Sequence, residues 1–140
     1  MMECSVSSDE ILARYVTSSR WFHQRDLTVK QDAFIPPDSE LSVTRHVNFS
    51  DGDIWAIGRK IAAGASRTLH GRADVKTFYV INQHLRVEAS PVPDNPNHAN
   101  IVNWPSNKDA RKMCALEIAK ASRFIPNPDE RAQVSVVNTF

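Results

Sequence analysis

A strand pattern is followed directly by a helix pattern between Glu40 and Gly64. In Glu40–Val47 apolar and polar residues alternate, which predicts a strand with one apolar face. Ser50 with Asp53 forms a capping box, which predicts the start of a helix that ends near Gly64. Apolar residues recur in it at helical spacing, at Ile54, Trp55, Ile57, Gly58, Ile61 and Ala62. The chain therefore combines a sheet with at least one helix that packs on it.

The other patterns supply more strands than helices. A capping box at Ser7 predicts a first helix that ends near Ser19, and a box at Ser106 predicts a third helix. Strand patterns occupy residues 27–30, 76–81, 85–89 and 99–104, and the second and third of these predict a hairpin. The expected class is α+β, with an antiparallel or mixed sheet of three to five strands and about three helices packed on one side. We expect one domain over residues 1–125 and an extended tail over 126–140 that can supply an edge strand at 134–137.

Composition and charge exclude several classes of protein. The 140 residues suffice for one core without disulfide or metal staples, and 41% hydrophobic residues is ordinary for a globular domain. A net charge of +1 gives no overall attraction to nucleic acid or membranes. Cys4 and Cys114 have no paired spacing, so neither a disulfide nor a zinc site is predicted. Because no membrane-length apolar run and no signal-peptide pattern occur, we expect a cytoplasmic protein without cofactor or metal.

The stretch from Pro91 to Pro105 is both stiff and polar. It holds four of the eight prolines, which favour an extended, irregular path, and four asparagines, whose side chains can bond neighbouring backbone. His98 and Asn100 are the first candidates for groups that this stretch presents. A stiff loop loses little ordering entropy on binding, so a protein partner is expected here. The candidate contact residues are Asn97, Asn100, Asn103 and Trp104.

A second candidate binding segment runs from Arg20 to Arg25. It contains two large aromatic side chains, Trp21 and Phe22, among cationic ones. Single-stranded nucleic acid is bound in this way, because bases stack on rings while cations hold phosphates. Arg20, Trp21 and Arg25 are therefore candidate nucleic-acid contacts. The alternative is that both aromatic residues anchor this segment in the core while the arginines stay in water.

Two short segments share the form His-x-Asn-apolar, at His46 and at His98. Paired histidines can serve as base and acid toward a phosphodiester near neutral pH. The form resembles the paired His-x-Thr/Ser-apolar motifs of the two-histidine phosphoesterases, and it departs from them by carrying asparagine in place of the hydroxyl that binds phosphate. Because it covers only eight residues, this resemblance implies neither that fold nor that activity. Arg72 or Arg45 would stabilise the anion in such a site, although pairing of Arg72 with Asp74 as a surface ion pair is the simpler expectation.

Hydroxyls and an imidazole share the polar face of the predicted strand 40–47. Ser42, Thr44 and His46 occupy every second position of the strand and therefore share this face, where they either line a cleft or face water. Three functions therefore remain open. The favoured one is a small binding or accessory module that presents residues 91–105 to a protein partner. The alternatives are a metal-independent phosphodiesterase or ribonuclease that uses His46 and His98, and a nucleic-acid-binding domain that uses the segment from Arg20 to Arg25.

Overall fold

The structure is a computed structural model that describes residues 6–129. Its central strand is β1 (Ile11–Val16), at which the two halves of the sheet meet. It lies in a six-stranded antiparallel sheet with the order β4-β5-β2-β1-β3-β6. The other strands are β2 (Leu41–Arg45), β3 (Gly71–Lys76), β4 (Arg86–Ala89), β5 (His98–Val102) and β6 (Arg123–Pro126). The helices are α1 (Asp51–Gly64), α2 (Thr77–Ile81) and α3 (Lys108–Ala121), with 3₁₀ turns at η2 (Ser19–Trp21) and η3 (Gln31–Phe34).

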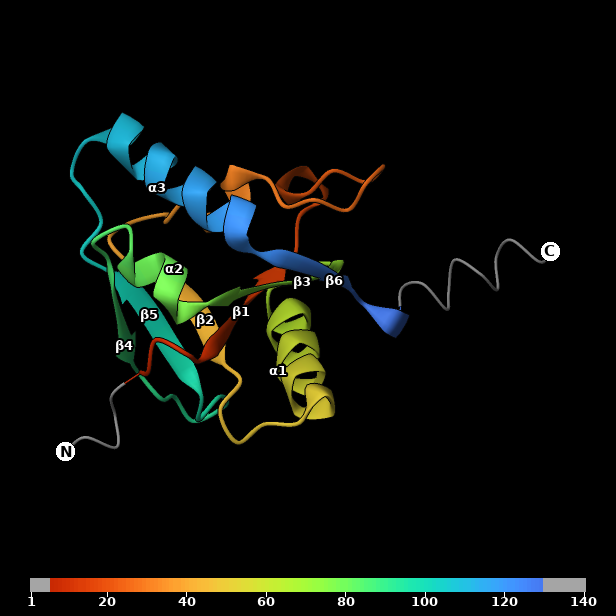
Figure 1. Ribbon diagram of the computed structural model, residues 1–140. Coiled ribbons are helices and arrows are strands. Elements are labelled where there is room, and N and C mark those ends of the chain that lie inside the picture. Colours follow the sequence, from red (N-terminus) through yellow and green to blue (C-terminus); the bar gives the residue numbers. More distant parts are fainter. Residues whose placement is uncertain (1–5, 130–140) are drawn as a thin grey trace.

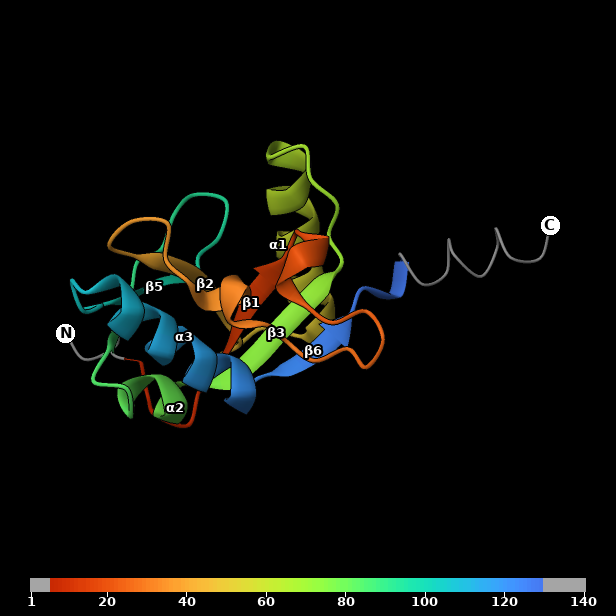
Figure 2. The same cartoon turned by 90° about the horizontal axis from the view of Figure 1, so that it is seen from above.

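The α+β class is confirmed, with six strands in place of the expected three to five. The expectation that the helices pack on one side is wrong, because they cover both faces of the sheet (Figures 1 and 2). α3, α2 and η3 share one core with Leu12 and Val16 of β1. α1 forms a second core on the opposite face with Ala13 and Tyr15 of the same strand.

This double burial explains why the helix predicted from Ser7 to Ser19 is wrong. A strand covered on both faces reads as a nearly continuous apolar run, which helical spacing also fits. Ser7 and Glu10 do form reciprocal local bonds, since Ser7 N donates to Glu10 Oε2 at 3.0 Å and Glu10 N donates to Ser7 O at 3.1 Å. These bonds close a turn that leads into β1.

The strand predicted over residues 76–81 is also wrong. β3 ends at Lys76, and the chain turns into the short helix α2. The backbone N–H and the hydroxyl of Thr77 both donate to Glu10 O, at 2.8 and 3.0 Å, which ends the ladder beside β1. The predicted hairpin is therefore absent, and β4 pairs instead with β5.

The strongest patterns are confirmed. α1 begins with the Ser50–Asp53 capping box and packs closely at Gly58, as its position in mid-helix suggested. β2, β4 and β5 lie within one or two residues of the predicted strands. α3 is capped by Asn107, whose side chain accepts from Ala110 N at 2.9 Å, in place of Ser106.

β6 pairs with β3 and ends at Pro126, one residue past the predicted domain boundary. The edge strand predicted at 134–137 lies outside the described residues. Between residues 6 and 129 no helix has the length and apolar character needed to span a membrane.

Candidate functional site

The asparagines of the 91–105 stretch mostly hold the chain in place. Asn95, which is buried, donates to Thr44 Oγ1 at 2.9 Å, and Asn97 Nδ2 donates to the carbonyls of Arg45 and Val47 at 2.8 and 2.6 Å. Val92 and Asn95 exchange two backbone bonds across a tight turn. The tip of this loop, residues 91–94, remains exposed.

The last residues of this stretch lie away from the tip. Asn103 Nδ2 donates to His84 O at 3.0 Å. Trp104 is half-buried against the core under α3, and its Nε1 donates to Ile101 O at 2.8 Å. Asn100 differs from these residues, because its side-chain amide bonds to nothing in the described part of the chain.

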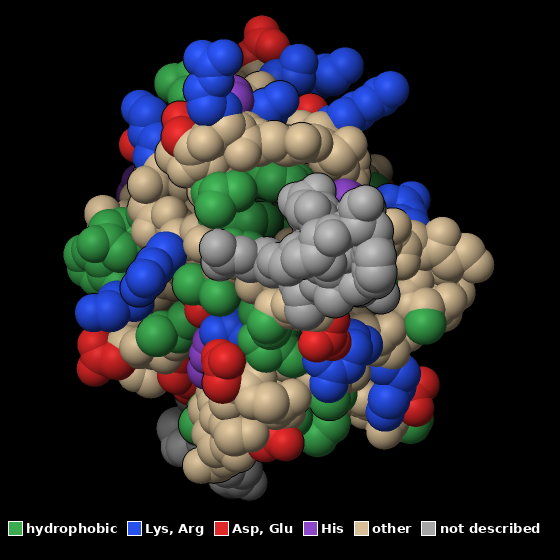
Figure 3. All heavy atoms as spheres, turned by 90° about the vertical axis from the view of Figure 1, so that its right-hand side faces the viewer, with side chains coloured by type: hydrophobic (Ala, Val, Ile, Leu, Met, Phe, Trp, Pro, Cys, Tyr) green, Lys and Arg blue, Asp and Glu red, His purple; other side chains and the backbone are tan. Residues whose placement is uncertain are grey.

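The segment from Arg20 to Arg25 divides its aromatic and cationic residues. Phe22 is buried and stacks on Phe124 with ring centroids 4.6 Å apart, and Trp21 is half-buried beside Arg14. Arg20 and Arg25 are exposed. Lys and Arg side chains gather along the upper rim of Figure 3, at the end of the molecule where Figure 1 shows this segment and α3. Phe22 thus belongs to the core, as the alternative expectation held for both aromatic residues, whereas Trp21 is only partly covered and the two arginines face solvent.

Arg72 and Asp74 pair as expected, but in the interior. Arg72 Nε donates to Asp74 Oδ1 at 3.1 Å, and the Arg72 side chain is only 6% exposed. Its guanidinium lies over the ring of Trp55, and its second terminal nitrogen donates to Asp51, whose pKa this hydrogen bond lowers. The expectation of a surface ion pair is wrong. The remaining nitrogen, Arg72 Nη1, is buried and has no hydrogen-bond partner in the described part of the chain.

His46 joins this cluster and His98 does not. His46 Nε2 lies 3.2 Å from Asp74 Oδ1, so the imidazole reaches across β1 toward β3. His98 Nδ1 lies 2.8 Å from Ser90 O, just after β4, on the other side of β2 in the strand order. The structure therefore brings His46 and Arg72 together through Asp74, and it turns His98 the other way.

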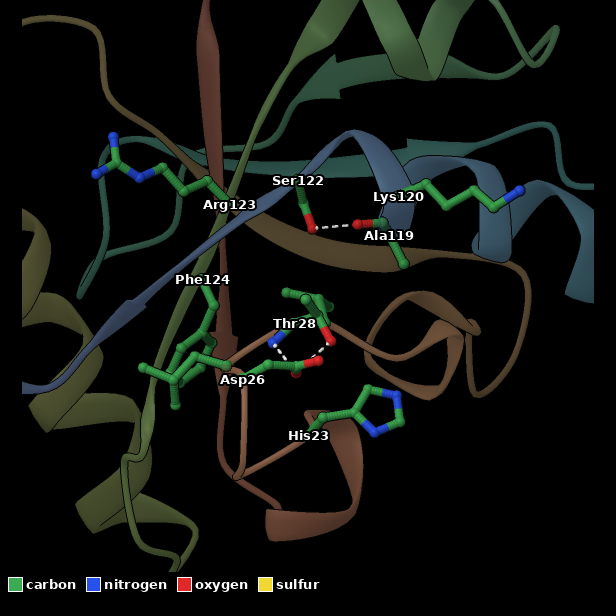
Figure 4. A pocket seen from close by; sticks show the side chains of 10 residues that line it. His23, Asp26, Thr28, Ala119, Lys120, Ser122, Arg123 and Phe124 are labelled. Atoms are coloured by element: carbon green, nitrogen blue, oxygen red, sulfur yellow. Dashed lines mark hydrogen bonds between the residues drawn. The ribbon is translucent and has the colours of Figure 1, made fainter.

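A cavity of about 600 Å³ lies between the 22–29 loop and the junction of α3 with β6 (Figure 4). Its polar groups bond to one another: Asp26 Oδ1 accepts from the N–H and hydroxyl of Thr28, and Ser122 Oγ donates to Ala119 O. The side chains of Lys120 and Arg123 extend in opposite directions, away from Asp26 and Thr28. This cavity is therefore large, but the charged side chains around it do not point toward a common position inside it.

A smaller cavity of about 100 Å³ has more distinctive chemistry. It lies where β1 and β2 separate: the two strands pair only at Leu12–Arg45 and Ala13–Thr44, whereas β1 pairs with β3 along its whole length. In Figure 2 the β2–β5 pair and the β1–β3 pair run in clearly different directions. The lining residues are Arg14, Tyr15, Thr17, Trp21, Ser42, Val43, Thr44, Ile61 and His98. We call this space the β1–β2 pocket.

Arg14 fills the gap in the ladder. Its Nε donates to Ala33 O at 2.8 Å and its Nη1 donates to Ser42 O at 3.1 Å, while the guanidinium stacks on Trp21 with 5.0 Å to the ring centroid. No carboxylate pairs with it within residues 6–129, and its Nη2 has no hydrogen-bond partner there. Burial lowers the pKa of Arg14 to about 10, so the group is still a cation at neutral pH. The pocket therefore contains a partly desolvated positive charge that has no counter-ion among residues 6–129.

The neighbouring polar groups have fixed roles. Because a carbonyl oxygen only accepts, the 2.8 Å contact to Ser90 O requires a proton on His98 Nδ1, which leaves Nε2 of the neutral ring as an acceptor. Burial raises the pKa of Tyr15, and its neutral phenol donates to Ile54 O. Ser42 is exposed, and its hydroxyl has no hydrogen-bond partner among residues 6–129, so that it can bond a ligand. The pocket thus offers a cation, an acceptor nitrogen and a hydroxyl.

Sequence reasoning identified His98, and it named Ser42 and Thr44 as possible cleft residues, but it missed Arg14. The available signal was a single arginine within the otherwise apolar run of residues 11–16. Comparison with family models, with curated proteins and with solved structures finds no match for this chain. Among the described residues, no three His, Cys, Asp or Glu side chains are grouped as metal ligands.

Proposed function

We propose that this chain is a binding domain that holds the anionic group of a small ligand, a phosphate or a carboxylate, in the β1–β2 pocket. The observation that carries the proposal is the guanidinium of Arg14, which is a half-buried cation without a carboxylate partner in the described chain. A charge removed from water costs free energy unless it is paired, and a bound anion offsets that cost. Arg side chains also suit the planar or tetrahedral oxygens of such groups.

The surrounding groups support a ligand that both accepts and donates hydrogen bonds. Arg14 Nη2 donates, the Ser42 hydroxyl donates or accepts, and His98 Nε2 accepts from a protonated oxygen of the ligand. A volume of about 100 Å³ admits the anionic group alone. The rest of the ligand therefore lies outside, over the neighbouring surface.

Titration calorimetry of the purified protein with inorganic phosphate tests this proposal. We expect saturable binding that weakens about tenfold or more in Arg14→Gln and is partly retained in Arg14→Lys, which keeps the charge. Arg25→Gln is the matched control, because it removes the same charge from an exposed site outside the pocket. Thermal unfolding of each variant checks that it is folded. Phosphate binding that Arg14→Gln leaves unchanged, or that Arg25→Gln weakens equally, contradicts the proposal.

A second candidate function is the docking of a protein partner on the loop tip at residues 91–94. It is favoured by the number of hydrogen bonds that hold this loop in place. They come from the side chains of Asn95 and Asn97 and from the contact between His98 and Ser90. A tip held in this way loses little entropy on binding. We expect a co-purifying partner to be lost on Val92→Asp and kept on Leu27→Asp, since these side chains are 42% and 40% exposed in different loops. A partner that both variants retain removes this candidate.

A further inference from the structure

Three polar side chains form a row beside the β1–β2 pocket. Ser42 on β2 lies directly opposite Asn100 on β5, and Asn100 lies directly opposite Glu88 on β4. Directly opposed residues of antiparallel strands share a face, with β-carbons about 5 Å apart. We call this row the polar platform.

The platform lies on the face that carries α1 but is not covered by it. The residues that alternate with the platform, Val43, Ala99 and Ile101, belong to the core under α3, so the platform points to the opposite face. On that face the core of α1 draws on β1, and it includes no residue of β2, β5 or β4. Ser42 and Glu88 are exposed and Asn100 is half-buried. The three platform positions are therefore accessible to a ligand, whereas Thr44 on the same face is buried beneath Asn95.

Asn100 is the distinctive member of the platform. Asparagine is unfavourable within strands, and where it does occur there its side-chain amide is usually stabilised by a hydrogen bond. The neighbouring Asn95, Asn97 and Asn103 all make such bonds, whereas the amide of Asn100 bonds to nothing between residues 6 and 129. An amide in mid-strand with an unused donor and an unused acceptor indicates a partner that supplies both.

We propose that the polar platform binds the hydroxyl-bearing body of the ligand whose anionic group enters the β1–β2 pocket, so that the ligand is a sugar phosphate. This inference rests on the proposed function, because it assumes the anionic group in the pocket. Ser42 belongs to both sites, which makes them continuous. The Asn100 amide donates and accepts, the Glu88 carboxylate accepts, and the Ser42 hydroxyl does either. This set matches neighbouring hydroxyls, each of which also donates and accepts.

Phosphate monoesters with different bodies test the inference by titration calorimetry. Ribose 5-phosphate and propyl phosphate carry the same phosphate group, but the first joins it to a sugar with hydroxyls and the second to an apolar alkyl chain. Inorganic phosphate carries neither group. We expect ribose 5-phosphate to bind about tenfold tighter than propyl phosphate, because only its hydroxyls pair with the platform. Free ribose should bind far more weakly, since it lacks the charged group.

Two platform variants should remove this preference and leave inorganic phosphate binding unchanged. Asn100→Val suits a strand, so folding is preserved while both hydrogen-bonding groups are lost. Glu88→Gln removes the carboxylate on the edge strand, and Glu117→Gln on α3 is its matched control, as both are exposed glutamates in ion pairs. Equal affinity for ribose 5-phosphate and propyl phosphate, or a preference that survives in Asn100→Val, overturns this inference alone. Absence of phosphate binding in the unaltered protein overturns the proposed function as well.

Discussion

Gly58 of α1 lies directly against the ring of Tyr15 on β1. A β-carbon at position 58 would come within 2.5 Å of Tyr15 Cε1 and 3.2 Å of Leu69 Cδ2. The Tyr15 ring is held in turn by its hydroxyl, which donates to Ile54 O of the same helix. α1 therefore approaches the sheet more closely than any residue with a side chain at position 58 would permit.

Gly58→Ala should destabilise the protein in spite of the better helix propensity of alanine. A clash in a packed core costs about 1–3 kcal/mol, which exceeds the gain of about 1 kcal/mol from replacing a mid-helix glycine. Urea unfolding measures the difference. Gly64→Ala is the matched control, because nothing lies within 4 Å of its β-carbon, and it should be neutral or stabilising. A Gly58→Ala variant as stable as Gly64→Ala would contradict this packing.

Trp55→Ala should cost about 3–5 kcal/mol of unfolding free energy. The side chain is 5% exposed in the core under α1, and it carries the Arg72 guanidinium 4.7 Å above its ring. Its removal therefore leaves a cavity and uncovers a buried cation. Phe78→Ala, at a ring that is 50% exposed, should cost far less in the same urea titration. A loss below about 1 kcal/mol in Trp55→Ala would show that α1 does not form a core.

Glu10 should make the stability depend on pH in the acid range. Burial alone would raise the pKa of this carboxyl, but the Arg45 side chain and the Ser7 N–H donate to it, and together they hold its pKa below the ordinary 4.5. A carboxyl with a lowered folded-state pKa stabilises the protein above its unfolded value, and that stability is lost as the pH falls through the folded value.

Urea unfolding of the unaltered protein and of Glu10→Gln at pH 7 and pH 3 checks this expectation. The variant should be less stable by about 1–3 kcal/mol at pH 7, and the difference should shrink at pH 3. Glu40→Gln, at an exposed glutamate without a described ion pair, should show no such trend. A difference that stays constant with pH would exclude the charged pair as its cause.

Asn97→Ala should loosen the loop between β4 and β5 without unfolding the domain. The variant leaves the Arg45 and Val47 carbonyls without their side-chain donor, a cost of about 1–3 kcal/mol. Amide hydrogen exchange at Val92 and Asn95, which bond to each other across the tip, should accelerate. Asp94→Ala at the exposed tip is the control and should leave this exchange unchanged.

The helices and strands that could be predicted from the sequence are those that bury only one face, because their apolar residues then recur with a clear period. α1 has one apolar face and a complete capping box, and β2 has one buried face, so periodicity identifies both. β1 could not be identified in this way, because α1 and α3 bury opposite faces of the same strand. α2 depends on Thr77 meeting Glu10 O across the sheet, a contact that no local pattern contains.

The residues of the candidate site could likewise be predicted only in part. Asn100 and His98 stand out in the sequence because asparagines and a histidine gather among prolines, and both lie on or beside the open face of the sheet. Arg14 belongs to the site only because β1 and β2 separate after two paired positions. Such a separation follows from the twist and packing of the whole sheet, which the residues of either strand alone do not specify.

β6 is the last described strand of the chain, and it covers the outer edge of β3. During synthesis, β3 leaves the ribosome well before β6 follows. A fragment that stops short of Arg123 leaves the outer edge of β3 unpaired, and in it Phe22 lacks the Phe124 ring on which it stacks. An unpaired strand edge is a template for pairing with another chain, so we expect such a fragment to self-associate where the intact sheet does not.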